Sequence, residues 1–118
     1  MRPGSRAPAA LAADVVCVLM FCAIGRRSHA EGVTLAGVAQ TAWPFLTGTA
    51  LGWVLIRAWR RPAALLPTGV TVWLATVVAG MLLRKLSGQG TAVSFIVVAA
   101  LTTAALLLGW RAIARSVF

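Results

Sequence analysis

Acidic and catalytic side chains are scarce in this sequence. Its 118 residues include one His, two acidic residues and no Tyr, against eleven Lys and Arg. Enzymes build their sites from nucleophiles, general acids and bases, or metal ligands. No nucleophile and base pair, phosphate-binding loop or metal-ligand cluster can be assembled from the residues present. We therefore expect no enzymatic activity, no metal and no cofactor.

Cysteine is nearly absent, and the two that occur do not form a bridge with each other. Cys17 and Cys22 lie five positions apart in one apolar stretch, where a helix would point them roughly 140° apart. Neither has a His or a second Cys at metal-ligand spacing. We interpret both as small packing residues.

Charge is also rare, since charged residues make up 11% and hydrophobic residues 60% of the chain, whereas about a quarter of a soluble domain is charged. Four apolar runs are each close to the ~17 to 25 residues that span a bilayer. These runs predict an all-α, polytopic membrane protein with a single domain over residues 1–118, in which four transmembrane helices form a compact bundle. The expected helices are 8–24, ended by Gly25, then 29–56, 67–83 and 92–110.

The formal net charge of +9 would suggest nucleic acid if the protein were soluble. Instead, every basic residue lies in a tail or connector, where it would meet lipid headgroups. We therefore expect the lipid bilayer as partner and no nucleic acid. Seven basic residues would share a side with both termini and four would lie opposite, which predicts cytoplasmic termini. The seven are Arg2, Arg6, Arg57, Arg60, Arg61, Arg111 and Arg115, and the four are Arg26, Arg27, Arg84 and Lys85.

The first connector contains a polar cluster. Ser28 and Glu31 have the spacing of a capping box for the second helix, which gives Glu31 a structural role. His29, Arg26 and Arg27 are left as residues that could line the mouth of a site or contact headgroups. A lone His at a helix start is more often solvated than functional, although it could titrate near neutral pH.

Proline interrupts the second helix. Pro44 has no amide hydrogen and displaces the chain from the carbonyl of Gln40, freeing that oxygen. We expect either a polar notch at this point or a kink whose carbonyl is satisfied by a neighbouring Thr.

Small residues recur at helical spacing in the middle of the chain. Gly48 and Gly52 form a G-x-x-x-G pair in the second helix, and Gly69 and Gly80 share a face of the third. Such faces let helices approach closely in a membrane. We expect these four glycines to mediate helix packing.

A weak internal repeat relates the two halves of the chain. Gly52 and Trp53 are echoed by Gly109 and Trp110. Two tandem helix hairpins would then be related by a pseudo-twofold axis along the membrane normal, as in parallel-repeat transporters. The same offset pairs Arg26, Arg27 and Gly32 with Arg84, Lys85 and Gly90.

Asp14 is the only formally charged residue inside an apolar run, and a charge at membrane depth needs a reason. It lies near the centre of its run, close to the expected depth of Pro44. With Gln40 and the freed carbonyl it could form one buried polar site that carries a proton or cation. The alternative is that Asp14 joins helices by hydrogen bonds.

Several of these residues together resemble a known family. The chain is similar to the prokaryotic membrane proteins grouped as domain of unknown function 3054. This resemblance implies a four-helix integral protein of a prokaryotic plasma membrane and no particular activity. It is carried by Asp14, the run from Gly25 to Glu31, Trp43 to Phe45, Ser94 with Phe95, and Gly109 to Arg111.

In architecture alone, the chain is also similar to small multidrug resistance transporters, which are dimers that exchange protons for cationic drugs through a first-helix Glu. Here Asp14 replaces that Glu and Tyr is missing. From the residues and this likeness we expect a small transporter or ion-coupled homodimer with its site at Asp14, for a substrate that the sequence does not reveal. The alternative is a scaffold that binds another membrane protein through its small-residue faces.

Overall fold

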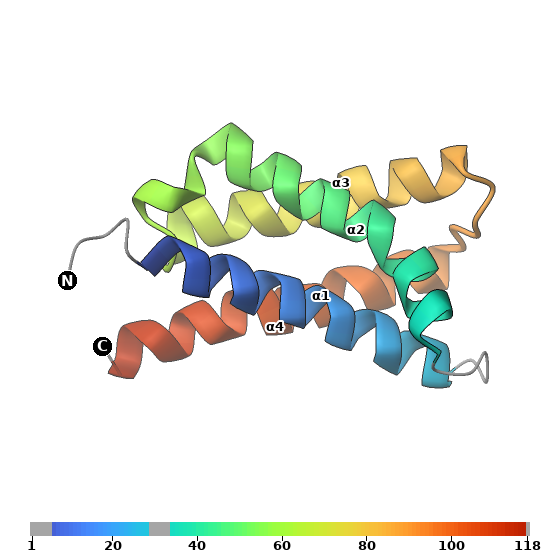
Figure 1. Cartoon of the computed structure of the whole chain (residues 1–118), viewed down its shortest axis with the longest axis horizontal. Helices are drawn as coiled ribbons and strands as arrows, with labels where there is room; N and C mark the ends of the chain where they lie inside the picture. The colour runs from blue at the N-terminus through green and yellow to red at the C-terminus, as the bar shows by residue number, and fades with distance from the viewer. Residues whose placement is uncertain (1–5, 29–33, 118) are drawn as a thin grey trace.

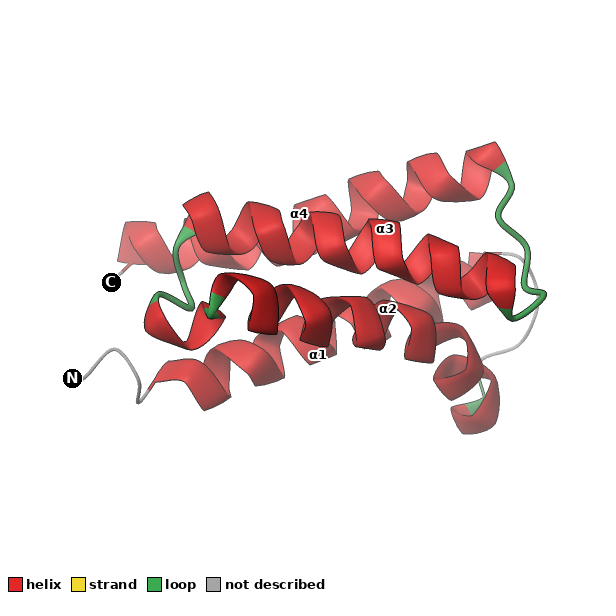
Figure 2. Cartoon of the chain, turned by 90° about the horizontal axis from the view of Figure 1, so that it is seen from above, coloured by secondary structure: helices red, strands yellow, loops and turns green. Residues whose placement is uncertain are grey.

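The computed structural model describes residues 6–28 and 34–117, and these fold into four helices that lie lengthwise beside one another (Figure 1). The start of the first helix and the end of the last helix lie at the same end of the bundle (Figure 1). No strand occurs in these two ranges, as Figure 2 shows. The helices are α1 (Ala7–Ser28), α2 (Leu35–Ile56), α3 (Val70–Leu86) and α4 (Val93–Val117), with a short 3-10 helix, η2 (Ala58–Arg60), and a helical turn, η3 (Leu65–Gly69), between α2 and α3.

The dimensions of the bundle suit a membrane. Its longest extent is 43 Å, and a bilayer with its headgroups is about 40 to 45 Å thick. Three segments of the described chain are long and apolar enough to cross: Ala7–Gly25, Leu65–Leu86 and Val93–Ser116. The all-helical prediction is therefore confirmed, and three of the four expected spans meet the composition that a crossing requires. The 22 residues of α2 do not meet that criterion.

Two helix boundaries differ from those expected. Thr34 is extended, with φ −112° and ψ 156°, and its side chain accepts a hydrogen bond from the amide of Gly37. Thr34 is thus the N-cap of α2, so the prediction that this helix begins at residue 29 is wrong. The backbone of Ser28 belongs to α1, which continues through Gly25. The capping partner proposed for Ser28, Glu31, lies outside the described residues.

The last helix also continues past its expected end at Trp110. It reaches Val117 because no Gly or Pro follows Trp110, and the tail is instead rich in helix-forming Ala and Arg. Arg111 is therefore part of α4 and not of a solvated tail.

Glycines allow α2 and α3 to pack in backbone contact. A Cβ atom on Gly48 would lie 2.6 Å from the carbonyl oxygen of Ala75, and one on Gly52 would lie 3.0 Å from the Cα of Val72. The first distance is closer than a Cβ atom tolerates, and the second is tighter than nearly all Cβ contacts in proteins. The G-x-x-x-G face of α2 is therefore used inside this chain.

The two glycines predicted on the third helix also lie in close contacts. A Cβ on Gly80 would meet the ring of Phe45 at 2.5 Å, and one on Gly69, in the turn before α3, would meet the side chain of Arg111 at 2.9 Å. Phe45 in turn packs edge to face on Phe21, with ring centroids 5.2 Å apart. Small residues thus make room for the large side chains of the core.

Candidate functional site

Asp14 and Arg111 form a buried ion pair. Nη1 of Arg111 donates to Oδ1 of Asp14 at 2.9 Å, and Nη2 donates to Oδ2 at 2.8 Å. Both side chains are completely buried. Parallel donation by a guanidinium to a carboxylate is the strongest arrangement that an ion pair of this kind can adopt.

Two tryptophans complete the surroundings of the carboxylate. Nε1 of Trp53 donates to Oδ2 of Asp14 at 2.8 Å, and Nε1 of Trp110 donates to Oδ1 at 2.8 Å. These are the two tryptophans that the internal repeat pairs with each other. Each half of the chain therefore supplies one indole, and each indole donates to a different oxygen of Asp14.

The guanidinium is held equally firmly. Its Nε donates to the carbonyl of Pro62 at 3.0 Å, and Nη1 also donates to the carbonyl of Leu107 at 3.0 Å. Arg111 further lies over the ring of Trp110, 4.5 Å from its centroid. Through these contacts one cluster joins α1, α2, α4 and the connector after α2. Among the described residues, no buried side-chain nitrogen or oxygen lacks a hydrogen-bond partner.

This cluster corrects the expectation of one polar site around Asp14, Gln40 and Pro44. Asp14 lies at the level of Trp53, near the end of α2. Gln40 is 13 residues earlier on the same helix, or about 20 Å at 1.5 Å per residue. Asp14 therefore holds helices together, and the site expected to join it to Gln40 does not form.

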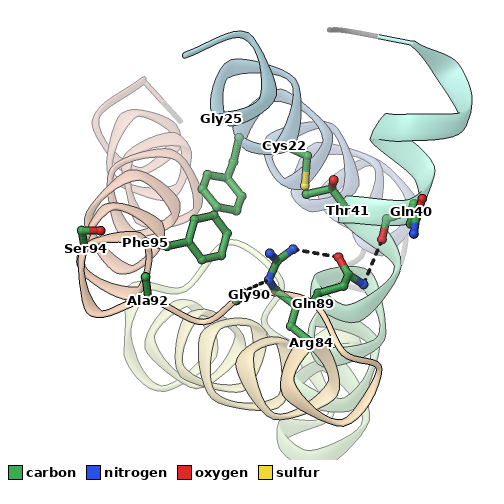
Figure 3. Close-up of a pocket in the computed structure, with 11 residues that line it drawn as sticks. Cys22, Gly25, Gln40, Thr41, Arg84, Gln89, Gly90, Ala92, Ser94 and Phe95 are labelled. Atoms are coloured by element: carbon green, nitrogen blue, oxygen red, sulfur yellow. Dashed lines mark hydrogen bonds between the residues drawn. The ribbon is translucent and has the colours of Figure 1, made fainter. Parts of the chain in front are cut away.

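A pocket lies at the opposite end of the bundle, between the end of α1, the start of α2 and the connector from α3 to α4 (Figure 3). Its volume is about 440 Å³, within the range of small-molecule sites. Polar groups and aromatic rings both line it. The lining residues are Phe21, Cys22, Gly25, Gln40, Thr41, Arg84, Gln89, Gly90, Ala92, Ser94 and Phe95.

Arg84 is the one charged residue among those lining residues. Its Nε donates to the carbonyl of Gly90 at 3.0 Å, and Nη1 donates to Oε1 of Gln89 at 2.9 Å. The guanidinium carbon also lies 4.4 Å from the ring centroid of Phe95. Figure 3 shows these side chains grouped around the pocket. The connector thus fixes a cation beside an aromatic ring.

The carbonyl that Pro44 frees forms part of this pocket. Nε2 of Gln89 donates to the backbone oxygen of Gln40 at 3.4 Å (Figure 3). The first turns of α2 are set at an angle to the remainder of the helix (Figure 1), as expected where proline interrupts the backbone ladder. The hydrogen-bond donor to this oxygen is Gln89 of the connector, whereas one expectation from the sequence was a neighbouring Thr. The polar notch therefore lies at one end of the bundle and not at mid-depth.

The residues expected at the mouth of a site are only partly described. The backbones of Arg26 and Arg27 lie in the last turn of α1, beyond Gly25 of the pocket lining. His29 and Glu31 lie outside the described residues. Lys85, next to Arg84 on α3, is exposed.

The pocket combines a guanidinium with aromatic rings. Within the described part of the chain, no group of three or more His, Cys, Asp or Glu could hold a metal ion. A guanidinium attracts anions and matches the geometry of carboxylates and phosphates. Phe21 and Phe95 offer an apolar wall beside it. The pocket suits a small anion that also carries an apolar part.

Sequence reasoning missed Arg111, Arg84 and Gln89 because it assigned all three to solvated connectors or tails. A signal for Arg111 existed. A lone acid inside an apolar run needs a basic partner. Arg111 is a basic residue that directly follows the last apolar run. No comparable signal marks Gln89, whose position depends on the path of the connector.

The model of a family described as "Protein of unknown function (DUF3054)" matches residues 11–114 of this chain. The chain belongs to that family, and the resemblance seen in the sequence is confirmed. The match includes every residue of the ion-pair cluster and of the pocket. No curated protein and no solved structure matches the chain.

Proposed function

We propose that this member of the family is a non-enzymatic integral protein of a prokaryotic plasma membrane that crosses the bilayer four times. The fourth crossing is α2. Its 22 residues span about 33 Å, and it runs lengthwise beside α1 and α3 (Figure 1). Its less apolar residues include Gly48 and Gly52, which pack against α3. Close packing of this kind shields the backbone of α2 from lipid.

Both termini lie in the cytoplasm in this proposal. Asp14 neutralises Arg111, so Arg111 no longer counts toward the positive charge on the side of the termini. Six basic residues then remain on that side and four on the opposite side. The excess still favours that side by the positive-inside rule. The pocket around Arg84 then opens toward the outer face.

The function that the geometry supports best is binding of a small anionic solute in the pocket around Arg84. The observation that carries this proposal is a fixed guanidinium beside the ring of Phe95 in a cavity of about 440 Å³. Transport of the bound solute is the use that we propose for such a site. The substrate of this transport is a carboxylate or phosphate that bears an apolar group.

The test is ligand-induced stabilisation of purified protein in detergent. A panel of small carboxylates and phosphate monoesters is screened by the thermal unfolding of wild type, Arg84→Gln and the matched control Lys85→Gln. We expect hits that stabilise wild type and Lys85→Gln but not Arg84→Gln. Equal stabilisation of Arg84→Gln, or no hit among the anions, would contradict the proposal. Uptake of each hit into proteoliposomes then separates transport from binding alone.

The second candidate is a scaffold or accessory protein. The faces on which this interpretation relied are occupied within the chain, because Gly48, Gly52 and Gly80 pack against the same bundle. The exposed surface of α4 favours this second candidate. Only 17% of its candidate span is buried, whereas the value is 33% for α1 and for the span that contains α3. We propose that α4 is the binding face in either case, for another membrane protein in a scaffold or for a second copy of this chain in a homodimer. Disulfide cross-linking of an Ala105→Cys variant in membranes tests this proposal.

A further inference from the structure

The connector after α2 presents three arginines to the surroundings. Arg57, Arg60 and Arg61 are exposed, and Trp59 between them is 45% exposed. Among the described residues, none of the three arginines is paired with a carboxylate, because the one described acid, Asp14, is fully engaged in the core. This end of the bundle therefore carries a concentrated positive charge.

The connector is held in place from inside the bundle. Arg57 adopts a left-handed conformation, with φ 53°, and its amide caps the last turn of α2. The 3-10 helix η2 follows, and Ala58 within it is completely buried. Pro62 is buried too, and its carbonyl accepts the hydrogen bond from Nε of Arg111. The buried ion pair thus fixes the path of the segment that carries the exposed arginines.

We propose that Arg57, Arg60 and Arg61 form a preorganised site for the phosphate headgroup of an anionic phospholipid. Guanidinium groups bind phosphate oxygens in pairs, with a geometry that lysine cannot reproduce. A backbone fixed in advance lowers the entropic cost of gathering three arginines around one headgroup.

A lipid is the occupant that the surroundings favour. The site lies directly at the end of α2, where Val54 and Leu55 are 64% and 66% exposed and available to acyl chains. Trp59 lies at the same end, and indole rings favour the level of the headgroups. Exposed apolar residues beside a cationic patch match a ligand that carries both acyl chains and a phosphate. The proposal requires the bundle to lie in a membrane but does not depend on the pocket around Arg84.

The experiment measures which lipids remain bound to the intact chain. Wild type is placed in nanodiscs of phosphatidylcholine with about 20% phosphatidylglycerol, released into mild detergent, and analysed by native mass spectrometry. We expect retained phosphatidylglycerol in excess over its share of the mixture. The excess should fall about fivefold in each of the single variants Arg57→Gln, Arg60→Gln and Arg61→Gln. Lys85→Gln, which removes one exposed charge at the opposite end, should keep it.

The circular dichroism melting curve of each variant shows whether it is folded. The three substitutions are also combined in one triple variant, and the double variant R60Q/R61Q replaces it if the triple variant does not fold. Equal enrichment of phosphatidylglycerol in wild type and in the folded arginine variants would overturn the proposal. An equal loss of retained phosphatidylglycerol in Lys85→Gln would also overturn the proposal, because lipid binding would then depend only on the net charge of the protein. Binding of polyglutamate to a wild type that retains no excess of phosphatidylglycerol would overturn it in favour of an acidic polypeptide.

Discussion

Asp14 and Arg111 are 97 positions apart in the sequence, yet their side chains meet in a fully buried bidentate pair near one end of the bundle. Two indoles and two backbone carbonyls complete the cluster around them. An acid that looked like a functional group in isolation is therefore a structural one. Its contacts join the beginning of the chain to its last helix.

The two indole donors should each stabilise the protein. Trp53→Phe and Trp110→Phe keep most of the packing but remove one hydrogen bond to a charged oxygen, which should cost about 1.5 to 3 kcal/mol of unfolding free energy. The matched control is Trp43→Phe, because Trp43 is 40% exposed and should change stability by less than about 0.5 kcal/mol. Denaturant unfolding in detergent measures all three. Equal effects at the three positions would contradict the role assigned to the indoles.

Close packing of α2 on α3 should make Gly48 intolerant of any side chain. Gly48→Ala places a Cβ against the backbone of Ala75, so we expect the helices to separate at a cost of about 1 to 3 kcal/mol.

Gly109→Ala is the control for this substitution, because nothing lies within 4 Å of the added atom. Alanine favours the helix by up to about 1 kcal/mol over glycine, so this variant should be as stable as wild type or more so. Thermal unfolding of both variants checks the prediction. Destabilisation of Gly109→Ala to the same extent as Gly48→Ala would contradict it.

A hydroxyl pair also joins these two helices. The Oγ1 atoms of Thr49 and Thr76 lie 2.7 Å apart and are buried. Thr49→Val should therefore cost roughly 0.6 kcal/mol, and up to about 1.7 kcal/mol. Thr47→Val, at an exposed position of the same helix, should cost less. The difference between their unfolding free energies in detergent is the quantity to measure, and a larger cost for Thr47→Val would argue against the contact.

The proposed topology of four crossings predicts that both chain ends lie on the same side of the membrane, and the proposed charge bias makes that side the cytoplasm. A tag on the N-terminus and a cysteine introduced as Ser116→Cys should be accessible from the same side of the membrane, and Ser87→Cys from the other. Protease protection and impermeant thiol reagents on oriented vesicles measure these positions. Accessibility of the N-terminal tag and position 116 from opposite sides would indicate three crossings, with α2 not spanning the bilayer.

The helices and their packing glycines could be predicted from the sequence because both depend on local patterns. Apolar length identified the runs, and G-x-x-x-G spacing identified the face of α2 that meets α3. The freed carbonyl at Gln40 followed from the covalent structure of Pro44. These inferences needed no knowledge of which helices are neighbours.

The site could not be predicted in the same way, because it depends on distant partners. Asp14 was placed at the depth of Pro44 because the sequence does not show which levels of the first two helices face each other, whereas the hydrogen bond from Trp53 places it near the end of α2. Arg111 was assigned to a tail because helix-forming residues after Trp110 were not read as a continuation of α4. The position of Gln89 beneath Gln40 arises from the folding of a connector that has no periodic signal.

A double-mutant cycle on Asp14→Leu and Arg111→Met tests most directly whether the pair is structural. Each single variant leaves one buried charge without its partner and should lose about 3 to 5 kcal/mol, whereas the double variant should lose far less than the sum of the two. The unfolding free energies are measured in detergent by tryptophan fluorescence. Strictly additive losses, or single variants as stable as wild type, would contradict the account.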